Sequence, residues 1–174
     1  QRELGDLRAV VLRLRELGWT VTCILGHSKG AAAVLRYGEK FDDVPLVVNV
    51  CGRFHTSETP RSRFTEEQWQ QLEKTGSFTW SSITNHPFFY PPLSPLLSHT
   101  LYTFCFDRIF LCRHSKVLTI HGTEDETIPV ADAHDFAKLI ARHELVVVEG
   151  ATHRFATESE QAAVIKALAP YVLQ

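Results

Sequence analysis

Four short apolar runs, separated by helical patterns, constrain the fold of this chain more than any other feature of its sequence. Each run is rich in Val, Ile or Leu, and the runs cover residues 20–25, 46–50, 116–120 and 145–148. Apolar residues at three- and four-residue spacing predict helices around these runs, at residues 4–17, 31–35, 130–142 and 158–172. Strands that are apolar on both faces need cover on both faces. The sequence therefore predicts an α/β fold, a mostly parallel sheet with helices on both faces.

The long connection between the second and third runs departs from this alternation. Residues 53–80 are polar, and residues 65–72 are typical of an exposed helix capped by Thr65. Residues 81–114 are rich in Pro, Phe, Ser, Leu and His but contain no Lys or Glu. A connection of roughly 60 residues is far longer than usual. We expect residues 1–174 to form a single partial domain in which 81–114 are an insertion, either a lid-like segment over an acyl pocket or, as we favour, irregular chain without a role.

Composition and charge narrow the range of partners. Lys and Arg number 18 against 20 Asp and Glu, a net charge of −2, so the sequence indicates no nucleic-acid partner. The most apolar stretch, residues 87–112, is interrupted by prolines and an Asp-Arg pair, so no transmembrane segment is expected. The four cysteines form no CxxC pair, and residues 1–17 are not a signal peptide. These features favour a soluble protein of the reducing cytoplasm.

The sequence Gly26-His27-Ser28-Lys29-Gly30 lies between the first predicted strand and the helix that follows it. A serine on such a sharp strand-to-helix turn projects its hydroxyl from the edge of the sheet, and only glycines allow the close packing around it. The backbone N–H of Lys29 then points toward the oxyanion of a reacting carbonyl, assisted by the start of the helix. The turn therefore predicts that Ser28 is a nucleophile.

A serine nucleophile needs a base, and the base needs an acid to orient it. Three acidic residues, Glu124, Asp125 and Glu126, follow the third predicted strand, and His153 follows the fourth. The carboxyl ends of parallel strands meet at one edge of the sheet, where α/β folds carry their sites. Serine, acid and histidine in this order, each after a separate strand, match the arrangement of α/β-hydrolases.

Three motifs together make the chain resemble the α/β-hydrolase fold superfamily. Ser28 lies in GHSKG, Asp125 in HGTEDETIP and His153 in EGATH. Over residues 1–52 and 115–174 the sequence is most similar to the serine-aminopeptidase S33-type, esterase/lipase-like branch found in plants. The HG-x-x-D-x-x-x-P pattern of that family implies that Asp125, rather than either neighbouring glutamate, is the acid. The family often has a second glycine after GHSKG, where this chain has an alanine.

The resemblance implies a serine hydrolase that cleaves carboxylic esters, or less readily amides and peptides, through an acyl-enzyme. Ser28 would attack the carbonyl, His153 would move the proton, and Asp125 would hold the tautomer of His153. The backbone N–H of Lys29 would donate to the oxyanion. Such an enzyme acts on a small ester or acyl substrate and needs no cofactor.

The histidines outside this predicted triad carry no metal signature. None has ligand spacing such as HExxH, so we expect no metal site. We expect His27, beside the nucleophile, and His121, at the end of the third predicted strand, to make structural hydrogen bonds.

Members of the family also have strands upstream of the first helix predicted here, and a loop in that region supplies the second oxyanion donor. This chain begins at Gln1 and contains no Met. We therefore expect residues 1–174 to be the C-terminal two thirds of a hydrolase domain. The alternative is that the truncated chain is catalytically weak or inactive and acts only as a binding or structural module. The oligomeric state stays open.

Overall fold

The structure of this chain, a computed structural model, comprises two compact units. One unit is formed by residues 1–54 with 106–174, and the other by residues 55–105. The residues that the structure describes are 2–55, 65–75, 79–81, 87–89 and 114–172. Every residue of the predicted site lies in the first unit, so the fold of that unit positions the site.

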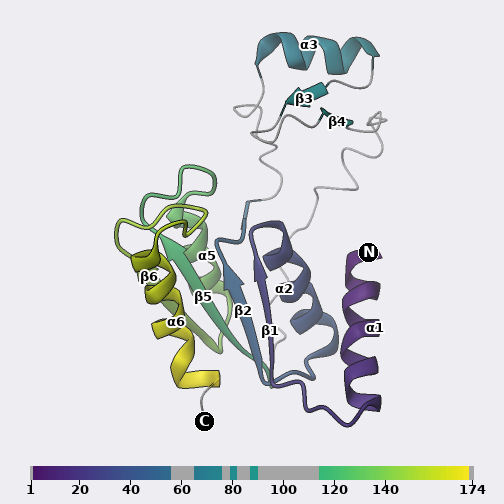
Figure 1. Ribbon diagram of the computed structural model, residues 1–174, viewed down its shortest axis with the longest axis vertical. Helices are drawn as coiled ribbons and strands as arrows, with labels where there is room; N and C mark the ends of the chain where they lie inside the picture. The colour runs from purple at the N-terminus through teal and green to yellow at the C-terminus, as the bar shows by residue number, and fades with distance from the viewer. Residues whose placement is uncertain (1, 56–64, 76–78, 82–86, 90–113, 173–174) are drawn as a thin grey trace. The chain divides into compact units, whose positions relative to one another are not determined.

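The first unit is built on a sheet of four parallel strands (Figure 1). Their order is β1-β2-β5-β6, and their bounds are β1 Cys23–His27, β2 Leu46–Val50, β5 Lys116–Gly122 and β6 His143–Val148. The predicted parallel sheet is confirmed, and β2 has the predicted bounds. The first strand begins later than predicted, because β2, its neighbour in the described sheet, starts only at Leu46, opposite Cys23.

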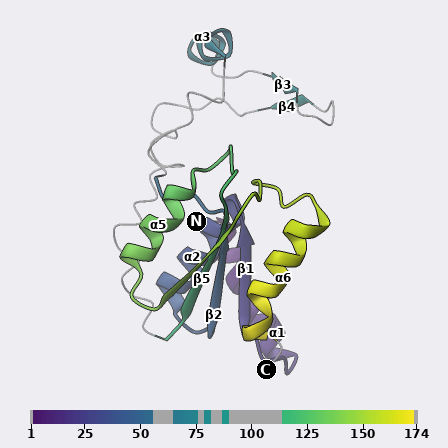
Figure 2. The ribbon, with the colours of Figure 1, turned by 90° about the vertical axis from the view of Figure 1, so that its left-hand side faces the viewer.

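Helices cover both faces of this sheet, as predicted. Their bounds are α1 Arg2–Glu16, α2 Lys29–Phe41, α5 Val130–Leu139 and α6 Glu158–Val172. Figure 2 shows the sheet between α5 and α6. α2 packs on β1 and β2, and α5 packs on β5 and β6. On the face toward α6, Val48 and Leu118 are fully buried in a cluster that includes Leu168 of that helix.

α5 differs from its prediction in length, and no described helix resembles a membrane span. α5 ends three residues before the predicted end, because Ile140 already has an extended backbone with φ −94° and ψ 114°.

Among the described helices, we find none with the length and apolar character that crossing a bilayer requires.

The apolar residues of α1 are less buried than their helical spacing predicts. Within α1, Val11 alone is fully buried, whereas Val10 is 55% exposed. The reason is that α1 packs on α2 rather than on the sheet (Figure 1). Polar contacts hold it there: the guanidinium groups of Arg8 and Arg15 both contact the Asp43 carboxylate, at 2.5 and 2.6 Å.

A chain of polar side chains crosses the buried sheet from β2 to β6. The amide Nδ2 of Asn49 donates a hydrogen bond to Oγ1 of Thr119 (3.1 Å), and Thr119 Oγ1 lies 2.8 Å from Nε2 of His143. A hydroxyl can donate one hydrogen bond and accept two, so Thr119 can bind either tautomer of His143. Burial disfavours the charged ring and lowers the pKa of His143 to about 4.

The described part of the second unit is small. It contains α3 Glu66–Thr75 and an antiparallel pair of strands, β3 Thr79–Ser81 and β4 Pro87–Phe89. The exposed helix predicted at residues 65–72 corresponds to α3. Most of the proposed insertion 81–114 lies outside the described residues, so its interpretation as a lid-like or irregular segment stays a prediction.

Candidate active site

The turn that carries Ser28 has a strained backbone. Ser28 lies between β1 and α2 with φ 54° and ψ −117°, a conformation that side-chain-bearing residues rarely adopt. Its N–H donates to the carbonyl oxygen of Val50 (2.8 Å), which holds the turn against β2. A Cβ on Gly26 would lie 2.2 Å from the carbonyl oxygen of Gly30. The first glycine of the motif is therefore required by a close approach of two backbone segments.

Lys29 is the first residue of α2, and its backbone amide and its side chain have different environments. The first N–H groups of a helix have no intrahelical partner, so the Lys29 amide is free to meet an oxyanion at the helix N-terminus. Its side chain is 85% exposed and pairs with Glu3 (2.5 Å). The backbone, and not the ammonium group, is the part of Lys29 suited to the site.

Asp125 lies in the turn after β5, and its carboxylate is surrounded by donors. Oδ1 accepts hydrogen bonds from the N–H groups of Thr127 (2.9 Å) and Ile128 (2.7 Å), and the side chain has no exposed surface. Burial alone would raise the pKa of Asp125, but hydrogen bonds from His121, His153 and Ile128 outweigh it and hold that pKa far below its usual value. The carboxylate is therefore ionised at neutral pH although it is buried.

His153 connects this carboxylate with the serine. Its Nδ1 lies 2.8 Å from Oδ2 of Asp125, and its Nε2 lies 3.0 Å from Oγ of Ser28. An ionised carboxylate accepts only, so Nδ1 carries a hydrogen, and in the neutral ring Nε2 then has the lone pair that can accept the hydrogen of the serine hydroxyl. The structure thus brings together the three residues that the sequence predicts as nucleophile, base and acid. Glu124 and Glu126 are exposed.

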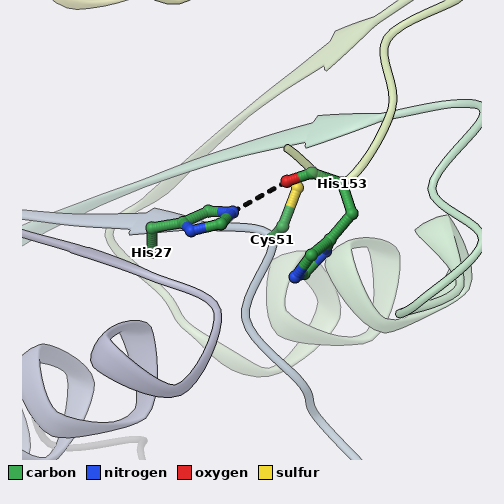
Figure 3. A group of neighbouring side chains, drawn as sticks. All are labelled: His27, Cys51 and His153. Atoms are coloured by element: carbon green, nitrogen blue, oxygen red, sulfur yellow. Dashed lines mark hydrogen bonds between the residues drawn. The ribbon is translucent and has the colours of Figure 1, made fainter. Parts of the chain in front are cut away.

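His27, the last residue of β1, links that strand to the loop of His153. Its Nε2 donates to the backbone carbonyl oxygen of His153 (2.8 Å), and the two imidazole rings lie 4.9 Å apart at an interplanar angle of 42°. Figure 3 shows the His27 ring directed at that carbonyl. The structural hydrogen bond expected for His27 is therefore present, and it is made to the backbone of His153.

Cys51 also belongs to this neighbourhood, although it was not among the predicted site residues. It follows β2 directly, is fully buried, and has a positive φ of 48°. Burial, together with the adjacent Asp125 carboxylate, raises the pKa of its thiol to about 12. The thiol is therefore a neutral donor beside Asp125. The sequence did contain one indication of this position: Cys51 directly follows the second predicted strand, and the carboxyl ends of the strands form the edge of the sheet where the site lies.

Among the residues that the structure describes, two groups of side chains have the atoms to bind a metal ion: His27 with Cys51 and His153, and Cys51 with His121 and Asp125. Within each group the potential ligand atoms lie within 4.8 Å of one another. These atoms are already engaged, because His153 binds Ser28 and Asp125, and His27 binds the His153 carbonyl. We therefore assign these groups to hydrogen bonding, in agreement with the sequence-based expectation for His27 and His121.

Comparison with known proteins finds solved structures of similar fold. No family model and no curated protein matches the sequence. Est1E from Butyrivibrio proteoclasticus, in a structure with ferulic acid bound, is 18% identical with a TM-score of 0.71, over 98% of this chain and 68% of Est1E. The esterase domain of a Rhodothermus marinus protein is 19% identical with a TM-score of 0.61, over 95% and 65% of the two chains.

The mouse alpha/beta hydrolase domain-containing protein 10 is similar in the same way. It is 17% identical with a TM-score of 0.60, over 96% of this chain and 68% of its own. The chain thus spans about two thirds of the length of these solved structures. At such low identity the likeness bears on the fold alone. The parallel sheet, its helices and these matches together show that the chain has the α/β-hydrolase fold.

Proposed function

We propose that the protein is a serine hydrolase that cleaves carboxylic esters through an acyl-enzyme. The observation that carries this proposal is the hydrogen-bonded series in which Ser28 Oγ lies 3.0 Å from His153 Nε2 and His153 Nδ1 lies 2.8 Å from Asp125 Oδ2. A serine hydroxyl is a poor nucleophile unless a base takes its proton, and a neutral imidazole held in one tautomer is suited to that task.

The first step forms a bond from Ser28 Oγ to the acyl carbon while the hydroxyl proton moves to Nε2 of His153. The resulting imidazolium is stabilised by the ionised Asp125, and the carbonyl oxygen becomes an oxyanion near the N–H of Lys29. Collapse of this intermediate expels the alcohol, which takes the proton from His153. Water then repeats the same steps on the acyl-enzyme and releases the carboxylic acid with Ser28 restored.

The reaction class is supported by the fold as well as by the site. The similar solved structures include an esterase domain and a protein with a bound aromatic carboxylic acid, ferulic acid. We infer an esterase/lipase-like enzyme of the kind that the S33-type motifs suggest, with amides and peptides as poorer substrates. An ester panel should therefore include a ferulate ester beside short and long aliphatic acyl esters.

Covalent labelling tests the proposal directly. A fluorophosphonate probe should label the wild-type chain on Ser28, because the probe reacts with a serine that a base has activated. The matched variants are Ser28→Ala and Ser159→Ala, since Ser159 is an exposed serine outside the site. Labelling should be lost in the first variant and kept in the second.

Two outcomes would count against the proposal. Equal labelling of the wild type and Ser28→Ala would show that Ser28 is not activated. Labelling of Ser28 without turnover of any ester in the panel would favour the alternative function, a catalytically inactive chain that serves as a binding or structural module.

A further inference from the structure

His121 is a buried imidazole at the end of β5 that the proposed reaction does not use. It is fully buried, and its Nε2 lies 2.9 Å from the carbonyl oxygen of Ile128 and 3.2 Å from Oδ2 of Asp125. A carbonyl and an ionised carboxylate are both acceptors only. Nε2 must therefore carry the ring hydrogen, which lies between the two oxygens.

The second ring nitrogen supports the same tautomer. Among the described residues, no group forms a hydrogen bond with Nδ1 of His121, which is buried. A buried N–H without a partner is costlier than a buried lone pair without one. The geometry therefore places the hydrogen of His121 on Nε2 and leaves Nδ1 bare.

His121 reaches both oxygens of Asp125 by different routes. It contacts Oδ2 directly, which is the oxygen that accepts from His153 Nδ1 (2.8 Å). It also binds the carbonyl of Ile128, whose N–H donates to Oδ1 (2.7 Å). A single imidazole thus restrains the carboxylate and the loop that encloses it.

We propose that His121 is a positioning residue for the acid of the site, holding Asp125 in the orientation in which its Oδ2 accepts the hydrogen of His153. This inference rests on the proposed function, because orienting Asp125 has a catalytic consequence only if His153 acts as the base. In metal sites, loss of a group that orients a ligand from behind typically costs about 10- to 100-fold in activity or metal affinity, and we expect an effect of the same order here.

The first test needs no variant. Long-range ¹⁵N–¹H NMR of the wild-type chain should identify His121 as the Nε2–H tautomer. Observation of the Nδ1–H tautomer, or of hydrogens on both nitrogens at neutral pH, would overturn the inference. This measurement remains decisive even if a His121 variant does not fold.

The second test uses a matched pair of amides, His121→Gln and His121→Asn. The glutamine amide nitrogen reaches the place of Nε2, whereas the shorter asparagine places its nitrogen near Nδ1. The readouts are the low-field ¹H resonance of His153 Nδ1–H, assigned by its loss in His153→Gln, and the rate of fluorophosphonate labelling. His121→Gln should keep the resonance and label within about threefold of wild type, and His121→Asn should lose the resonance and label about 10- to 100-fold more slowly.

The outcomes separate this inference from the proposed function. If His121→Asn keeps both the resonance and the labelling rate, or if His121→Gln loses both as His121→Asn does, the inference is wrong. If the wild type shows the resonance and the variants differ in that resonance as expected, but Ser28 is never labelled, the positioning of Asp125 stands and the hydrolase proposal is wrong.

Discussion

The Nε2 of His27 donates a hydrogen bond of 2.8 Å to the backbone carbonyl of His153. This bond connects the last residue of β1 with the loop after β6, two segments that are not neighbours in the sheet order. His27 directly precedes Ser28, so the bond ties the backbone of the proposed base to the strand that carries the proposed nucleophile. It accounts for how the two loops keep a distance of 3.0 Å between Ser28 Oγ and His153 Nε2.

Replacement of His27 should loosen this connection. We expect His27→Ala to lower the free energy of unfolding by about 1 kcal/mol, the typical contribution of one hydrogen bond, and to slow labelling of Ser28. His27→Gln, which retains a donor at a similar reach, should be closer to wild type in both. Urea denaturation and labelling rates measure the two effects. Equal behaviour of the alanine and glutamine variants would show that the hydrogen bond is unimportant.

Gly26 should not tolerate even a methyl group. In Gly26→Ala the new Cβ would lie 2.2 Å from the carbonyl oxygen of Gly30, so the turn must shift. We expect a loss of about 1–3 kcal/mol in the free energy of unfolding, the range typical of overpacking. The control is Gly5→Ala, in exposed α1 with no atom within 4 Å of the added Cβ, which should gain about 0.5–1 kcal/mol. A Gly26→Ala protein as stable as wild type would contradict the close approach seen here.

The start of α6 should lose stability in acid through Glu160. The N–H groups of Thr152 and Thr157, and then their hydroxyls, donate to this carboxylate and lower its pKa to about 2, from 4.5 for the unperturbed group. A lowered pKa in the folded state means stabilisation that is complete above about pH 4.5 and is lost as the pH falls through 2. Glu160→Gln should therefore have a lower Tm than wild type at pH 7.

Thermal denaturation followed by circular dichroism at several pH values checks this prediction. The difference in Tm between wild type and Glu160→Gln should shrink as the pH falls from about 4.5 toward 2, because both side chains are then neutral. Glu158→Gln, a change at an exposed neighbour, should leave Tm nearly unchanged at every pH. A Tm difference that is constant with pH would show that the charge of Glu160 is not involved.

His143 should make the protein less stable on mild acidification. Burial lowers its pKa to about 4 in the folded chain, while the unperturbed group has a pKa of 6.5. Between these two values the unfolded chain binds the proton and the folded chain does not, so stability falls as the pH drops from about 6.5 to 4. His143→Gln, whose side-chain amide can also form a hydrogen bond with Thr119 but does not titrate, should show a shallower fall. Urea denaturation at several pH values gives the free energy of unfolding of both proteins as a function of pH. Parallel curves for the wild type and His143→Gln would contradict this prediction.

Cys51 should resist alkylation in the folded protein. Its thiol is fully buried and has a pKa of about 12, so Cys51 is almost never an accessible thiolate, the form that reacts with alkylating agents. Cys23 is only partly buried and serves as the internal comparison. Peptide mass spectrometry after iodoacetamide treatment should find Cys23 modified before Cys51, and both modified in urea. Faster modification of Cys51 would mean that the loop around the acid opens readily.

Local patterns were sufficient to predict the elements that carry the site. β2 has the predicted bounds, and the helix predicted at residues 158–172 coincides with α6 Glu158–Val172. The sharp turn at Ser28 was predicted from its flanking glycines and is present with a φ of 54°. These features depend on a few adjacent residues, on side-chain periodicity and on the space that glycine leaves, so a single sequence is enough to identify them.

The environment of each helix could not be predicted in the same way. The spacing of apolar residues in α1 indicates a buried face, but Val10 is 55% exposed because the helix packs on α2 instead of on the sheet. Periodicity states which side of a helix is apolar. It does not state how much of that side another element covers.

The sequence by itself determined the fold class and a serine, an acidic cluster and a histidine at the ends of three strands. The family pattern already implied Asp125 as the acid, but only the tertiary structure shows how it meets His153: Asp125 turns inward to bind the N–H groups of Thr127 and Ile128, while its two glutamate neighbours stay exposed. It also decided that His121 and Cys51 border the same carboxylate. Ser28 and His153 are separated by 125 residues, and their contact depends on strand order and register rather than on any local pattern.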